Sequence, residues 1–95
     1  MSENPFESVS QSAERTKTYR CPCCDFKTLF GREGFEICPV CFWEDDGQDT
    51  HDADSVRGGP NGVLSLSEAR KNFKLHQASA PKFLKSVRPP LADEI

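Results

Sequence analysis

Hydrophobic residues along this chain occur in short groups, and one segment has the periodicity of an amphipathic helix. Segment 66–78 carries three apolar residues on one helical face, namely Leu66, Ala69 and Phe73. Residues 65–68 read Ser-Leu-Ser-Glu, a capping box that begins a helix. Pro81 prevents the helix from continuing, and residues 83–87 predict one further turn before two consecutive prolines.

Three short segments have the residue types of β-strands. Residues 18–20 lead into the first group of cysteines, and residues 26–30 follow it. Two glycines within 31–34 predict a turn, after which residues 35–37 are expected to return as a second strand beside 26–30. Residues 44–62 show neither a helical nor a strand pattern and are expected to be irregular.

The composition indicates a chain with little material for a core. It has 95 residues, 28% of them charged, and a mean hydropathy of −0.62. Leucine, isoleucine, valine and phenylalanine make up about a fifth of the residues, close to the level at which chains tend toward disorder. So small a chain buries little apolar surface. We therefore expect the folded state to be stabilised by something besides hydrophobic burial.

The amino-terminal residues and the apolar runs bear on location. Residues 1–16 are polar, predict a flexible tail and lack the apolar core of a signal peptide. No apolar run approaches the ~18 residues of a membrane span, so no membrane association is expected. We expect a cytoplasmic protein, in which cysteines stay reduced and metal binding is favoured over disulfides.

Two copies of the pattern Cys-Pro-x-Cys supply four of the five cysteines. They occupy residues 21–24 and 38–41, with 13 residues between them. Two residues between thiolates allow one tight turn to direct both sulfurs at one ion, and two such turns complete the tetrahedral site typical of structural zinc. The sequence predicts one metal ion per chain, zinc first and iron as the alternative, with the ligands Cys21, Cys24, Cys38 and Cys41.

These motifs together predict a small α+β, metal-stabilised domain. Its architecture is expected to be a zinc-ribbon or rubredoxin-like hairpin with two cysteine turns and one packed helix at about 66–78. The domain is expected to span 17–88, between the tail 1–16 and a carboxyl-terminal tail 89–95. Its core is expected to contain the larger aromatic side chains, which are Phe26, Phe35, Phe42, Trp43 and Phe73.

Cys23 is the odd cysteine, because it occupies a variable position within the first motif. Its side chain is expected to point away from the metal. The simpler interpretation is a partly exposed spare thiol. The alternative is a reactive or ligand-exchanging thiol whose pKa is lowered by the nearby metal.

Three strings of residues resemble the bacterial cysteine-rich CPCC family. They are Cys-Pro-Cys-Cys at 21–24, Ile-Cys-Pro-Val-Cys-Phe-Trp-Glu-Asp-Asp-Gly at 37–47, and Gly-Pro-Asn-Gly-Val-Leu-Ser-Leu-Ser-Glu-Ala-Arg-Lys-Asn-Phe at 59–73. The resemblance covers about residues 19–76. It implies a zinc-ribbon-like module with the same four ligands, and it implies no particular activity.

An acidic loop follows the second motif, and we give that name to residues 44–54. Within it lie His51 and six acids without any lysine or arginine, namely Glu44, Asp45, Asp46, Asp49, Asp52 and Asp54. The loop is interpreted as a solvated segment that meets the basic helix residues Arg70, Lys71 and Lys74. The alternatives are a binding site for a basic protein, or a second metal or hydrolytic site around His51.

Charge is distributed unevenly, with a net −7 over residues 1–54 and +4 over residues 55–95. The leading hypothesis is a non-enzymatic, zinc-stabilised module that contacts another protein. A specific version is an immunity or antitoxin-type protein whose acidic loop covers a basic nuclease toxin. Nucleic-acid binding is the second alternative and would need the basic stretch 70–88, because the cysteine-bearing half is acidic.

Overall fold

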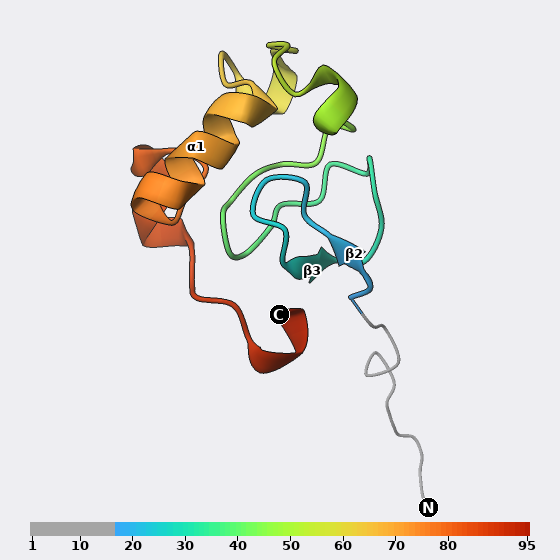
Figure 1. The fold of residues 1–95 in the computed structure, drawn as a ribbon, viewed down its shortest axis with the longest axis vertical. Coiled ribbons are helices and arrows are strands. Elements are labelled where there is room, and N and C mark those ends of the chain that lie inside the picture. Colours follow the sequence, from blue (N-terminus) through green and yellow to red (C-terminus); the bar gives the residue numbers. More distant parts are fainter. Residues whose placement is uncertain (1–16) are drawn as a thin grey trace, which may run out of the picture.

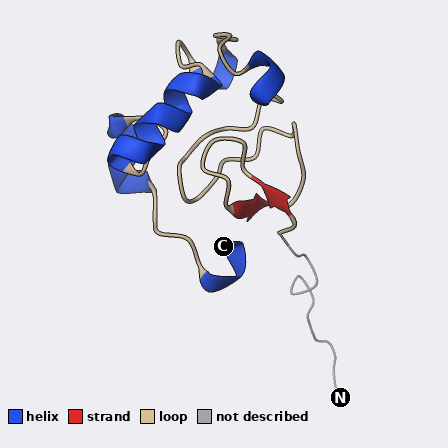
Figure 2. Cartoon of the chain, viewed as in Figure 1, coloured by secondary structure: helices blue, strands red, loops and turns tan. Residues whose placement is uncertain are grey.

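A computed structural model describes residues 17–95, and the tail expected over residues 1–16 lies outside this range. Figures 1 and 2 show two short strands, one α-helix and several single turns of 3-10 helix joined by long coil. The strands are β2 (Tyr19–Arg20) and β3 (Lys27–Leu29), and the helix is α1 (Leu66–His76). The 3-10 turns are η2 (Thr50–Asp52), η3 (Gly59–Asn61), η4 (Pro81–Ser86) and η5 (Ala92–Glu94). No helix in the described part of the chain is both long and apolar enough to cross a membrane.

The hairpin forms around the first cysteine turn. Strand β2 pairs antiparallel with β3, and Tyr19 lies opposite Leu29. The expected pairing of 26–30 with 35–37 is therefore wrong. Residue Ile37 instead makes an isolated antiparallel bridge to Glu44, which encloses the second cysteine turn in the same way.

The backbone of residues 31–36 explains why no strand returns there. Glu33 and Phe35 adopt positive φ values of 65° and 61°, which interrupt an extended chain. The carboxylate of Glu36 accepts hydrogen bonds from the Phe30 and Gly31 amides, at 3.0–3.2 Å. It therefore takes the place of the backbone carbonyl groups that a neighbouring strand would offer to these amides. Phe35 is consequently 55% exposed, and its expected place in the core is wrong.

Helix α1 begins where the capping pattern predicts. The Ser65 hydroxyl accepts a hydrogen bond from the Glu68 amide at 3.0 Å, and the helix ends at Gln77 in the left-handed conformation. Leu66 and Ala69 are fully buried against the cysteine-bearing coil. Phe73 meets Phe26 edge to face, with ring centroids 6.3 Å apart. One helical face therefore closes the core from the side, as Figure 1 shows.

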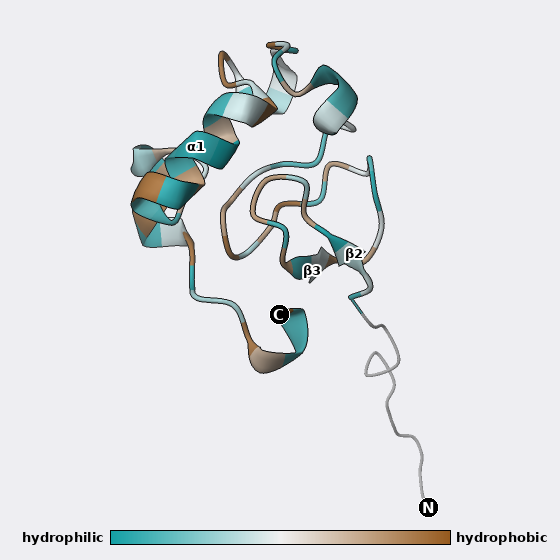
Figure 3. Cartoon of the chain, in the orientation of Figure 1, coloured by the Kyte–Doolittle hydropathy of each residue, from teal (hydrophilic) through white to brown (hydrophobic). Residues whose placement is uncertain are grey.

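The core itself is small and rich in cysteine. Trp43, Leu29 and Leu66 are its largest fully buried apolar side chains, and all five cysteines are buried around them. Figure 3 shows hydrophobic colours along the coil near the helix, whereas the stretch that carries η2 is mainly hydrophilic.

The carboxyl-terminal segment packs against the domain, whereas a tail was expected over residues 89–95. The Ser79 amide donates to the Cys41 carbonyl at 2.7 Å, and the Arg88 amide donates to the Pro39 carbonyl at 3.1 Å. These bonds hold the chain after α1 against the second cysteine turn. The segment then ends beside β3, as Figure 1 shows.

Glu94 secures this end, and its side chain is fully buried. It accepts two hydrogen bonds from the Arg88 guanidinium at 2.9 Å, one from the Leu91 amide at 2.8 Å and one from Lys17 at 2.5 Å. These donors, Arg88 foremost, lower the pKa of Glu94 from 4.5 to about 2 although burial opposes the shift. The two ends of the described chain are thus joined through one carboxylate.

We predict that Glu94→Gln lowers the free energy of unfolding at neutral pH by about 1–3 kcal/mol, because a charged acceptor of four donors is lost. A carboxylate with a lowered folded pKa stabilises the protein above its unfolded pKa and loses that contribution as pH falls. The difference between the two proteins should therefore shrink between about pH 5 and pH 2, measured by denaturant unfolding at each pH. The exposed neighbour gives the control, since Asp93→Asn should change little; a difference for Glu94→Gln that is independent of pH would contradict the ion-pair assignment.

Candidate metal centre

The first cysteine turn is built by backbone hydrogen bonds. The Asp25 amide donates to the Cys21 carbonyl at 2.8 Å, and the Cys23 amide donates to the Cys21 sulfur at 3.4 Å. Asp25 leaves the turn with a φ of 68°. The turn therefore presents an N–H group to a ligand sulfur, as a thiolate requires.

The second turn repeats this geometry. The Phe42 amide donates to the Cys38 carbonyl at 2.8 Å, the Val40 amide donates to the Cys38 sulfur at 3.4 Å, and Phe42 has a φ of 70°. Two turns of the same shape, each enclosed by a short antiparallel pairing, thus face one another. The two predicted motifs are confirmed as structurally equivalent.

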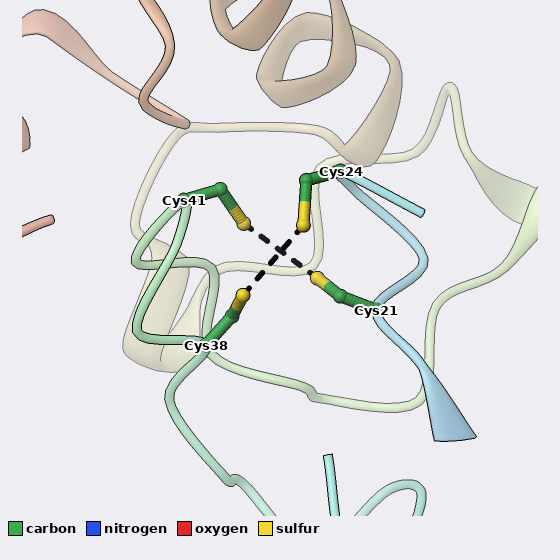
Figure 4. Close-up of side chains that lie close together, drawn as sticks. All are labelled: Cys21, Cys24, Cys38 and Cys41. Atoms are coloured by element: carbon green, nitrogen blue, oxygen red, sulfur yellow. Dashed lines mark hydrogen bonds between the residues drawn. The ribbon is translucent and has the colours of Figure 1, made fainter. Parts of the chain in front are cut away.

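The four predicted ligand residues come together at one point. Their sulfur atoms all lie within 4.8 Å of one another, and Figure 4 shows them pointing at a common centre from two separate stretches of chain. The sulfur of Cys21 lies 3.6 Å from that of Cys41, and the sulfur of Cys24 lies 3.7 Å from that of Cys38. Each residue is at most 9% exposed.

These distances fit a metal-thiolate site. A tetrahedron with zinc–sulfur bonds of about 2.3 Å has sulfur–sulfur edges of about 3.8 Å. The two closest sulfur pairs lie within 0.2 Å of that edge. Four buried cysteines in this arrangement have the donor set, the size and the closed surroundings that a tetrahedral ion needs.

The neighbouring sulfurs shift one another's pKa values. Hydrogen bonds from Cys21, Cys24 and Cys41 lower the pKa of Cys38 well below its usual range. Contacts with the neighbouring sulfurs, Cys21 first, and burial raise the pKa values of Cys24 and Cys41. Positive charge placed among these sulfurs would favour their ionised forms.

Thr28 also contacts the cysteine cluster, and the sequence did not predict this role. Its buried hydroxyl lies 3.0 Å from the Cys38 sulfur, and burial of Thr28 on β3 directs it there. The one signal in the sequence was a threonine four residues after Cys24. This hydroxyl donates to Cys38 and helps to lower the pKa of that thiol.

Cys23 is 7% exposed and belongs to the apolar core. The expectation of a partly exposed thiol is therefore wrong. Its amide donates to the Cys21 sulfur, and its thiol lies in the core, where it contacts the thiol of Cys41.

The acidic loop is largely bonded to its own domain. Asp45 is fully buried and accepts from the Arg32 Nε at 2.9 Å and from the Glu33 amide at 2.7 Å. Asp49 accepts from another nitrogen of Arg32, also at 2.9 Å, and this contact is the main reason that its pKa is lowered. Arg32, which the sequence had not singled out, therefore neutralises two acids of the loop.

The remaining members of the loop have local roles. Asp52 accepts from the Asp49 amide at 2.8 Å and from Arg57, and these bonds lower its pKa. Asp46 accepts from the Gln48 amide, and Asp54 accepts from the Ser67 hydroxyl on α1. The expected neutralisation by helix residues is limited to Arg70, which lies 3.9 Å from Asp49.

The alternative site around His51 is not assembled. His51 is exposed, and its ring lies 3.8 Å from the Asp52 carboxylate. Over residues 17–95, the four cysteines are the only group of three or more potential metal ligands that lie close together. The described residues therefore do not assemble a second metal site around His51.

We predict that Asp45→Asn lowers the free energy of unfolding by about 2–3 kcal/mol, because it leaves Arg32 without its buried partner. The matched control is Glu44→Gln, because the Glu44 side chain makes no hydrogen bond or ion pair within residues 17–95. This substitution should change the free energy of unfolding by less than about 0.5 kcal/mol. Urea unfolding of both variants measures the difference. Equal effects would mean that Asp45 is an ordinary surface acid.

One comparison with known proteins identifies the family of this chain. A search of curated proteins and a search of solved structures each found no match. The model of the family described as "Cysteine-rich CPCC" matches residues 19–94, which include both cysteine turns, the acidic loop, α1 and the packed carboxyl-terminal segment. The chain belongs to the cysteine-rich CPCC family.

Proposed function

We propose that this protein is a small, non-enzymatic domain that binds one structural zinc ion and acts by contact with another protein. The observation that carries the proposal is the buried tetrahedral group formed by Cys21, Cys24, Cys38 and Cys41. A structural site of this type uses all four coordination positions for protein ligands, whereas a catalytic zinc keeps one position open. Zinc is favoured over iron because four-thiolate sites that only hold a fold together typically contain it.

The ion would join the parts of the fold. It would link the hairpin around residues 21–24 to the bridge around residues 38–41, and the carboxyl-terminal segment is hydrogen-bonded to the second of these. Such binding contributes directly to folding in small domains. A cytoplasmic location, where thiols remain reduced, suits this chemistry and is part of the proposal.

Protein contact is proposed because the side chains capable of chemistry serve the fold. Four thiols form the cluster, and most acids of the acidic loop accept hydrogen bonds from arginines or backbone amides. Several large apolar side chains nevertheless remain exposed on this mainly polar chain, among them Phe35, Ile37 and Leu84. Exposed apolar side chains mark a site for a partner where they gather into one patch.

We predict one zinc ion per wild-type chain, measured by native mass spectrometry and elemental analysis of protein purified without added metal. Cys38→Ser should lose the ion and the cooperative unfolding transition, because it removes one of four ligands and binding is coupled to folding. Cys23→Ser provides the control in the same domain and should retain one zinc ion. Iron in place of zinc would correct the metal, and a folded wild-type protein without bound metal would refute the proposal.

A further inference from the structure

A hollow of about 570 Å³ lies between α1, the segment that follows it and the cysteine turns. Its apolar lining includes Phe73 from α1, Leu84 and Val87 from the following segment, and Phe26 and Val40 from the cysteine-bearing coil. Figure 1 shows α1 and η4 side by side where these segments meet. We call this hollow the helix groove. Its volume is in the range of sites that bind small molecules or single anchoring side chains.

The ionisable residues that line the helix groove are all of basic types. Lys74, His76 and Arg88 line it, and no aspartate or glutamate among the described residues does so. Arg88 is already paired with Glu94, which leaves Lys74 as its uncompensated charge. An occupant that combines an apolar group with negative charge would satisfy both parts of this lining.

The surroundings extend the same positive charge. Residues 69–92 contain six lysines and arginines and no acid. Within residues 17–95, no carboxylate forms an ion pair with any of the four lysines of this stretch, which are Lys71, Lys74, Lys82 and Lys85. Three carboxylates of the acidic loop, those of Asp45, Asp49 and Asp52, are paired with Arg32 or Arg57 instead.

We propose that the helix groove is the partner-binding surface and that it accepts a segment of another protein with one large apolar side chain flanked by aspartate or glutamate. This inference rests on the proposed role in protein contact, and it names the surface and the chemistry of the partner. The apolar side chain would enter between Phe73 and Leu84, and the acidic neighbours would lie near Lys74. The partner is thus acidic, the reverse of the basic partner expected for the acidic loop.

An apolar interior favours a peptide over a nucleic acid here. A nucleic acid would bind through its phosphates to any of the exposed lysines, and it would show little dependence on Leu84. A peptide anchored by an apolar side chain depends on both the groove and its charge. The two kinds of occupant therefore give different results with the same variants.

The test uses the full-length protein and fluorescein-labelled ten-residue peptides in a fluorescence polarisation titration. The first peptide has a central phenylalanine between acidic residues, the second has serine in place of phenylalanine, and the third has phenylalanine between lysines. We expect the first to bind at least about tenfold more tightly than the other two. Equal binding of the serine peptide, or no binding of any peptide by the folded protein, would overturn the inference.

Two matched pairs of variants locate the binding site. Lys74→Glu should weaken binding of the first peptide by about fivefold or more, whereas Lys71→Glu, with the same change of charge on the same helix but outside the groove, should change it by less than about twofold. Leu84→Glu should weaken binding in the same way, and Leu75→Glu, an exposed position outside the groove, should not. Equal effects within a pair would overturn the assignment to the groove.

Two further measurements distinguish an acidic peptide from the other possible occupants of the helix groove, a nucleic acid and a second copy of the chain. Tighter binding of a ten-nucleotide oligothymidine that displaces the peptide would identify a nucleic-acid surface, and self-association in sedimentation velocity that blocks the peptide would identify a second copy of the chain. Either result would overturn the proposal. Zinc content is measured on the same samples, so a missing ion counts against the structural-zinc proposal alone, while peptide binding by the folded chain still decides the groove.

Discussion

The close approach of four cysteine sulfurs is the constraint around which the described structure is arranged. Cys21, Cys24, Cys38 and Cys41 place their sulfur atoms within 4.8 Å of one another inside a domain that excludes solvent from them. Four thiolates at this spacing cannot coexist without a cation, and four neutral thiols would gain only weak hydrogen bonds from the same burial. The turns, the N–H···S bonds and the Thr28 hydroxyl together provide the surroundings that a bound cation would need.

The other elements are arranged around this centre in a definite order. Each cysteine turn is closed by its own short pairing, at Tyr19–Leu29 and at Ile37–Glu44, and neither pairing is long enough to be stable alone. Helix α1 covers the cluster from one side with Leu66 and Ala69, and the following chain binds the backbone of the second turn. The small apolar core therefore gains its order from the cysteine cluster, which agrees with the low content of aliphatic residues.

The sequence predicted those parts whose signal is local. The spacing of the cysteines, the capping pattern at Ser65 and the periodicity of 66–78 each depend on neighbours within a few residues, and the structure confirms all three. The hairpin was assigned to the wrong partner because Glu36, a side chain, supplies the bonds that a returning strand would have made. Arg32 was missed because its partner Asp45 lies 13 residues away, and Glu94 was missed because its burial depends on contacts with distant parts of the chain, such as Lys17, 77 residues away. A charged residue that will be buried looks like any other in a single sequence.

The uneven charge of the two halves has a different meaning once the contacts are known. A binding site for a basic protein was one alternative for the acidic loop because six acids lie within eleven residues, yet Arg32, Arg57 and backbone amides satisfy most of them. The lysines of residues 69–92 receive no such compensation from the described part of the chain. Charge that is paired within the fold contributes mainly to stability, and charge that is left unpaired beside an apolar hollow remains available to a partner. The acidic half thus pairs its carboxylates within the cysteine-bearing coil, and the basic half carries the lysines on which the proposed recognition would depend.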